Sequence, residues 1–123
     1  MKNNTDMSVL KLPHLPPILF AKKLLKKDGN VADVLIEFDE YPTLPMLVEA
    51  AAQSSAAFRK SEDESAFLAS IKNVELLIEP KSTTLISQII DEHTLGNFRY
   101  VSFKIFESDD KLIAKGSFVL IVH

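Results

Sequence analysis

The stretch that decides the fold is 44–60, Leu-Pro-Met-Leu-Val-Glu-Ala-Ala-Ala-Gln-Ser-Ser-Ala-Ala-Phe-Arg-Lys. It predicts a helix, because Thr43 is a suitable N-cap residue and Pro45 is tolerated in a first helical turn, where its missing N–H has no intrahelical partner. Up to Phe58, the only ionisable side chain of this stretch is Glu49. A helix that is apolar nearly all round is buried on most faces. We therefore expect this helix at the centre of the molecule.

The segments around the helix are typical of strands. Residues 31–38 are β-branched and apolar, and residues 98–107 alternate between apolar and polar side chains with the period of two that a half-buried strand shows. The apolar positions of 18–27 fit either a short helix or a first strand. After a charged loop at 61–65, four strands are expected at about Phe67–Ile78, Thr83–Glu92, Phe98–Glu107 and Lys111–Val122.

This order of elements predicts the architecture. One long apolar helix precedes four strands and follows another, and a sheet with one apolar face must cover that face. We expect an α+β protein in which an antiparallel sheet wraps around one long central helix. Apolar residues on the last two strands indicate an exposed edge and therefore a dimer. The 123 residues suit one domain, which we expect to span 9–123 after a flexible N-terminus at 1–8.

Composition excludes several classes of protein. The 14 Lys and Arg against 17 Asp and Glu give a net charge of −3, which argues against a nucleic-acid-binding module. The lack of cysteine excludes disulfides and thiolate metal sites and fits a reducing compartment. Neither a signal peptide at 1–6 nor a membrane span is indicated, so we expect a cytoplasmic protein.

No cofactor or metal ion is expected. The three histidines lack metal-ligand spacing, and the three glycines form no phosphate-binding loop. His93 follows a predicted strand and is expected in a solvated turn.

Three segments carry a resemblance to a known family. The sequence Glu-Ala-Ala-Ala-Gln at 49–53 resembles the Glu-Ala-x-Ala-Gln segment on the central helix of hotdog-fold β-hydroxyacyl-acyl-carrier-protein dehydratases, the FabZ-like group. Leu12-Pro13-His14 with Pro17 resembles their N-terminal Leu-Pro-His-x-x-Pro segment, and 67–74 resembles the strand usually written Phe-Leu-Ala-Gly-Ile-x-x-Val. The segments occur in family order over about residues 9–122. The resemblance implies the hotdog fold, in agreement with the architecture expected above.

The resemblance also implies a mechanism. In these dehydratases a loop histidine removes the α-proton of a 3-hydroxyacyl thioester, while the helix glutamate of the partner subunit protonates or positions the leaving hydroxyl. A backbone N–H at the start of the helix polarises the thioester carbonyl, since a helix N-terminus offers a donor and a partial positive charge. Transferred to this chain, Glu49 is the expected catalytic acid. Gln53, together with Leu44 and Pro45 at the helix start, is expected to bind substrate.

The loop that delivers the histidine differs in this chain. It contains Glu40-Tyr41-Pro42 where the family pattern has His-Phe-Pro, so Glu40 occupies the histidine position. Glu40 is either a solvated loop acid or a second catalytic carboxylate, one of the pair serving as base and the other as acid. Tyr41 is either a packing aromatic or a substrate-binding hydroxyl.

Three functions remain open on these residues. The first is a 3-hydroxyacyl thioester dehydratase of fatty-acid or related acyl metabolism, acting on acyl-carrier protein or coenzyme A thioesters. The second is an acyl thioesterase in which Glu49 acts as nucleophile or activates water. The third is a non-catalytic hotdog subunit that pairs with an active homologue. The resemblance implies a homodimer, a trimer of dimers or a heterodimer with a homologue.

Overall fold

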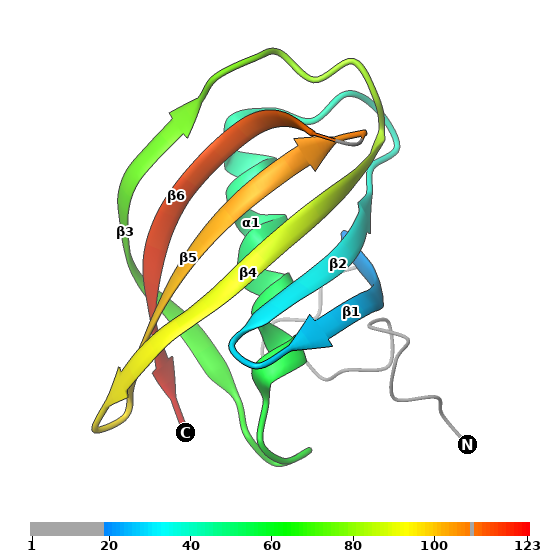
Figure 1. Cartoon of the computed structure of the whole chain (residues 1–123). Coiled ribbons are helices and arrows are strands. Elements are labelled where there is room, and N and C mark those ends of the chain that lie inside the picture. The colour runs from blue at the N-terminus through cyan, green and yellow to red at the C-terminus, as the bar shows by residue number, and fades with distance from the viewer. Residues whose placement is uncertain (1–18, 109) are drawn as a thin grey trace.

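The computed structural model describes residues 19–108 and 110–123 (Figure 1). The expected flexible N-terminus at 1–8 and the Leu12-Pro13-His14 segment with Pro17 lie outside the described residues. Within them, no helix is long and apolar enough to cross a membrane. The elements are β1 (Ala21–Asp28), β2 (Val31–Glu37), α1 (Leu44–Ser54), the 3-10 helix η2 (Ser55–Phe58), β3 (Ala66–Leu76), β4 (Thr84–Leu95), β5 (Phe98–Glu107) and β6 (Lys111–Val122).

The six strands form one antiparallel sheet in the order β1-β2-β4-β5-β6-β3. Figure 1 shows this sheet curving around α1. Along β5, the side chains of residues 99, 101, 103, 105 and 107 are buried and those between them are less so, which gives the sheet an inner face toward the helix and an outer face away from it. The expected α+β architecture, with an antiparallel sheet wrapped around one central helix, is confirmed. The ambiguous segment 18–27 provides a strand rather than a helix.

The central helix is shorter than the sequence predicted. It ends at Ser54 rather than Lys60 and continues as the single 3-10 turn η2. The hydroxyl of Ser54 donates to the carbonyl of Ala50 at 2.7 Å, and that of Ser55 donates to the carbonyl of Ala52 at 2.6 Å. Serine hydroxyls that bond to preceding carbonyls compete with the α-helical ladder, so the pair of serines is the physical reason for the early end.

The edge of the sheet is also different from the one expected. The last two strands, β5 and β6, lie inside the described sheet, whose two edges are β1 and β3, the latter paired with β6. Exposed apolar side chains gather there: Phe67, Leu68 and Ile71, the last with 48% of its surface accessible. The apolar edge predicted for a dimer therefore exists, but on β3.

Two contacts tighten the packing around the sheet. A Cβ atom on Gly116 would lie 2.8 Å from Val74 Cγ2 and 3.0 Å from the Phe103 ring, so β6 needs glycine at this inner position. Near the turn between β4 and β5, Arg99 Nη1 donates to Glu64 Oε2 at 3.0 Å, and the two side chains are only 4% and 10% exposed. This ion pair fastens the 61–65 loop under the sheet.

Candidate functional site

The only carboxylate on α1 is Glu49, in the second turn of the helix. Its side chain is half-buried, whereas its neighbours Val48 and Ala50 are buried. A carboxylate in such surroundings is costly unless other groups hold it. One group that the structure places against it is the side chain of Gln53.

Gln53 is buried, with 6% of its surface accessible, and its amide is fixed in orientation. Its Oε1 accepts hydrogen bonds from the backbone N–H groups of Phe20, at 2.7 Å, and Ala21, at 3.1 Å. Because the oxygen faces these donors, the NH2 group points toward Glu49, and Nε2 donates to Glu49 Oε2 at 3.4 Å. The glutamine thus links the start of β1 to the carboxylate one helical turn away.

These contacts give Gln53 a role that the sequence did not reveal. Substrate binding by Gln53, which the resemblance implied, stays a prediction; the hydrogen bonds described here run to the backbone of β1 and to Glu49. The spacing of four residues did indicate that the two side chains share a face of the helix. The two backbone donors lie more than 30 residues away in sequence, and no sequence signal marks them.

The start of the helix has the expected cap. Thr43 is the N-cap residue, with an extended backbone, and its carbonyl accepts the N–H of Leu47 at 3.0 Å. Pro45 stands at the second helical position, is exposed, and has no N–H to offer. Leu44, the first helical residue, is half-buried and has an N–H for which the helix contains no acceptor. Of the two residues predicted to bind substrate here, Leu44 alone can supply a backbone donor.

The loop before the helix is exposed. Glu40 lies at the surface, and Tyr41 is 61% accessible, whereas Pro42 between the loop and the helix is buried. Among the described residues, no hydrogen bond or ion pair connects Glu40 to Glu49. One chain therefore brings together Glu49 and Gln53, and it leaves the loop residues facing outward. Nor do the parts of the chain that the structure describes contain a group of three His, Cys, Asp or Glu residues able to hold a metal ion.

Comparison with known proteins identifies the fold. No protein-family model and no curated protein matches the sequence. Among solved structures, the dehydratase heterocomplex ApeI:P from Xenorhabdus doucetiae is similar with a TM-score of 0.71 and 14% identity, over 89% of this chain and 86% of that one.

Two further solved structures show the same similarity. A thioesterase from Haemophilus influenzae gives a TM-score of 0.68 at 13% identity, over 82% of this chain and 77% of that one. The dehydratase domain from the CurJ module of curacin polyketide synthase gives 0.69 at 13% identity, over 85% of this chain and 41% of that one.

The chain has a hotdog fold. The fold implied by the resemblance of 49–53 and 67–74 to FabZ-like dehydratases is thereby confirmed. At these identities the similarity concerns the fold, and the chemistry has to be argued from the residues themselves.

Proposed function

We propose that this hotdog protein is an enzyme that acts on acyl thioesters, with Glu49 as its catalytic carboxylate. The observation that carries the proposal is the Glu49–Gln53 pair: a lone carboxylate on an otherwise uncharged helix, held by a buried amide whose orientation the backbone of β1 fixes. A catalytic group needs such support to stay within reach of a reacting atom. The thioesterase and dehydratase structures that share this fold support the substrate class.

The reaction we favour is the dehydration of a 3-hydroxyacyl thioester, carried by acyl-carrier protein or coenzyme A. Glu49 would protonate the leaving hydroxyl, while a base removes the α-proton and a helix N-terminal N–H, that of Leu44, stabilises the developing oxyanion. The base we propose is Glu40, with Tyr41 beside the substrate. Because both face outward within one chain, they would act on the site of a second copy.

The second copy would pair along β3. Among the described strands this one pairs only with β6, and Phe67, Leu68 and Ile71 on it are exposed. Such an edge readily adds another strand and is a liability when left open. We therefore propose a homodimer through β3, or a heterodimer with a homologue.

Two alternatives follow from specific observations. Glu49 alone could activate water against the thioester, and this thioesterase reaction is favoured by the absence of a histidine from the 40–42 loop and by the thioesterase fold neighbour. A non-catalytic subunit that pairs with an active homologue is favoured by the neighbour described as a dehydratase heterocomplex.

The test follows a short trans-2-enoyl thioester by its absorbance in the presence of a thiol-trapping dye. We expect loss of the enoyl signal without thiol release in the unmodified protein, and loss of that activity in Glu49→Gln. The control is Glu37→Gln, an exposed carboxylate on β2, which should leave the rate unchanged. Thiol release that depends on Glu49 would establish the thioesterase instead. If the folded protein turns over neither the acyl-carrier-protein nor the coenzyme A thioester, the result would support the non-catalytic subunit.

A further inference from the structure

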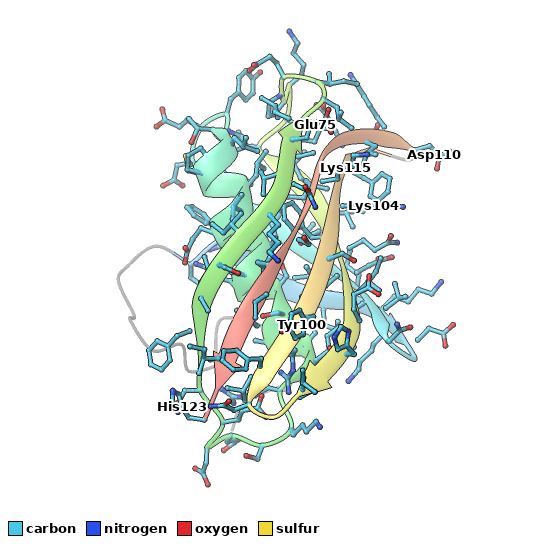
Figure 2. All side chains as sticks on the ribbon, turned by 90° about the vertical axis from the view of Figure 1, so that its left-hand side faces the viewer. Glu75, Tyr100, Lys104, Asp110, Lys115 and His123 are labelled. Carbon is cyan, nitrogen blue, oxygen red and sulfur yellow. The ribbon has the colours of Figure 1, made fainter. Side chains whose placement is uncertain are left out.

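A second candidate site lies on the outer face of the sheet, away from α1. A cavity of about 280 Å³ opens there over four neighbouring strands. Its polar lining consists of Lys72 on β3, Glu92 and His93 on β4, Tyr100 and Ser102 on β5, and Ser117 on β6. Figure 2 labels Tyr100 on this part of the sheet. The Glu49 site belongs to the helix on the other side of the sheet, so the two are separate.

A β-bulge aims two consecutive side chains into this cavity. Across β4 and β5, Asp91 pairs with Val101 but His93 pairs with Tyr100, so β4 has one extra residue at this point. In a regular strand Glu92 and His93 would point to opposite faces. Here the Glu92 carboxylate accepts the Ser102 hydroxyl at 2.6 Å, and both residues line the cavity. Bulges that redirect a side chain in this way are frequent beside functional sites.

The aromatic wall of the cavity comes from the same bulge. The His93 and Tyr100 rings stack with centroids 4.4 Å apart and an angle of 11° between their planes. Tyr100 is half-buried and His93 exposed. The expectation that His93 stands in a solvated turn is therefore wrong, because β4 continues to Leu95 and the bulge turns the imidazole onto the sheet.

The opposite end of the cavity carries a cation, beside a second irregularity. The pairing of β3 with β6 shifts between Lys72 and Glu75, and Asn73 has a left-handed backbone with φ of 55°. The Ser117 hydroxyl donates to the Lys72 carbonyl at 3.3 Å. Among the described residues, neither Lys72 nor Glu92 takes part in an ion pair. Their charges are available to a ligand.

The spacing of the strands sets the size of that ligand. Ser102 pairs with Ser117, and Ser117 with Lys72, so Lys72 and Glu92 are three strand spacings apart, about 14 Å between backbones. Both residues line the cavity, and Ser102 and Ser117 lie between them on the two intervening strands. A cavity of this width, with a cation at one end and an anion at the other, suits a molecule with opposite charges at the two ends of one ring.

We propose that this cavity binds a small planar zwitterion, with its carboxylate at the Lys72 ammonium, its ammonium at the Glu92 carboxylate, and its ring against the His93–Tyr100 stack. The ring supplies apolar contact on an aromatic face. The two ends are distinguished by charge, so the ligand binds in one orientation. The proposal does not depend on the reaction at Glu49.

The probe is 4-(aminomethyl)benzoate, titrated into the full-length, ¹⁵N-labelled protein and followed by amide chemical shifts. We expect saturable shifts at residues 72, 92–93, 100–102 and 117. Lys72→Met and Glu92→Gln should each weaken binding about fivefold, the effect of one exposed ion pair of about 1 kcal/mol. Glu92→Gln keeps an acceptor for Ser102. Lys23→Met, an exposed lysine on β1, should bind as the unmodified protein does.

Three outcomes would overturn the proposal. The first is the absence of saturable shifts at millimolar probe. The second is a set of shifts centred on 44–53 instead of the outer face. The third is equal affinity for benzoate or benzylamine, each of which lacks one of the two charges. A spectrum with native dispersion for each variant ensures that weaker binding is not caused by unfolding.

Discussion

Replacing Gln53 by leucine tests the central structural claim, that this side chain joins β1 to the helix. Leucine fits the volume but accepts no hydrogen bond, so the N–H groups of Phe20 and Ala21 lose their acceptor in a region where Ala21 is buried. An unpaired buried donor costs about 1–3 kcal/mol. We therefore expect the free energy of unfolding to fall by about 2–6 kcal/mol, and Tm by about 10 °C or more in a domain of this size.

The measurement is urea unfolding followed by circular dichroism, with the slope against denaturant checked for constancy. The matched control is Gln88→Leu, because Gln88 lies on the outer face of β4 and makes one hydrogen bond of 3.3 Å to Asp33; its cost should stay below about 1 kcal/mol. Equal effects of the two substitutions would refute the reasoning, since they would mean that the bonds to β1 contribute no more than a surface contact.

A second variant at the same position separates stability from the state of the carboxylate. Gln53→Glu keeps an acceptor for both N–H groups but replaces the donor to Glu49 by a second carboxylate. Two like charges 3.4 Å apart repel by about 1 kcal/mol in a water-like medium and about 5 kcal/mol at an effective dielectric constant of 20. We expect Gln53→Glu to lose stability at neutral pH and to regain it, relative to Gln53→Leu, under acidic conditions where both carboxyls are neutral.

Three further predictions concern the rest of the fold. Gly116→Ala should destabilise the protein by about 1–3 kcal/mol in thermal unfolding, because the new methyl group overlaps the Val74 and Phe103 side chains. The control Gly29→Ala, at φ of 63° with no atom near the new methyl group, should cost only the backbone strain of about 1–2 kcal/mol. Glu64→Gln leaves Arg99 buried without its counter-ion and should lower the free energy of unfolding by about 3–5 kcal/mol. Adding Arg99→Met removes the buried charge, so a double variant no more stable than Glu64→Gln alone would contradict this explanation. Ile71→Lys should shift a dimer toward monomer in light scattering, since it places a charge on the exposed edge.

Much of the fold was predictable because it rests on local patterns. The bounds of β5 and β6 agree with the expected 98–107 and 111–122, since the period of two and the short loop between them are both visible in the sequence. The start of α1 at Leu44 follows from the cap residue and the proline. The position of β3 at the edge was not predictable, because it results from a long-range pairing with β6 that no neighbouring residues encode.

The site was predictable only in part, for a similar reason. Glu49 stands out in the sequence as a lone charge in an apolar helix, and in the structure its side chain is half-buried. The role of Gln53 depends on backbone donors of a distant strand, and the cavity on the outer face depends on bulges at Glu92 and Asn73. Bulges are set by how neighbouring strands fit together, so their sequence signal is weak.

The edge strand connects the fold to the choice between the two enzymatic reactions. A dehydratase needs a base as well as an acid, and in one chain Glu40 faces solvent while Glu49 lies on the helix. In the dehydratase that we propose, the base would come from a second copy bound along the exposed edge at Ile71. A thioesterase that activates water with Glu49 needs no such partner. If Ile71→Lys yields a folded monomer, a dehydratase that takes Glu40 from its partner should lose enoyl hydration, whereas a thioesterase that uses Glu49 alone should still release thiol. Enoyl hydration that persists in the monomer would exclude Glu40 of a second copy as the base.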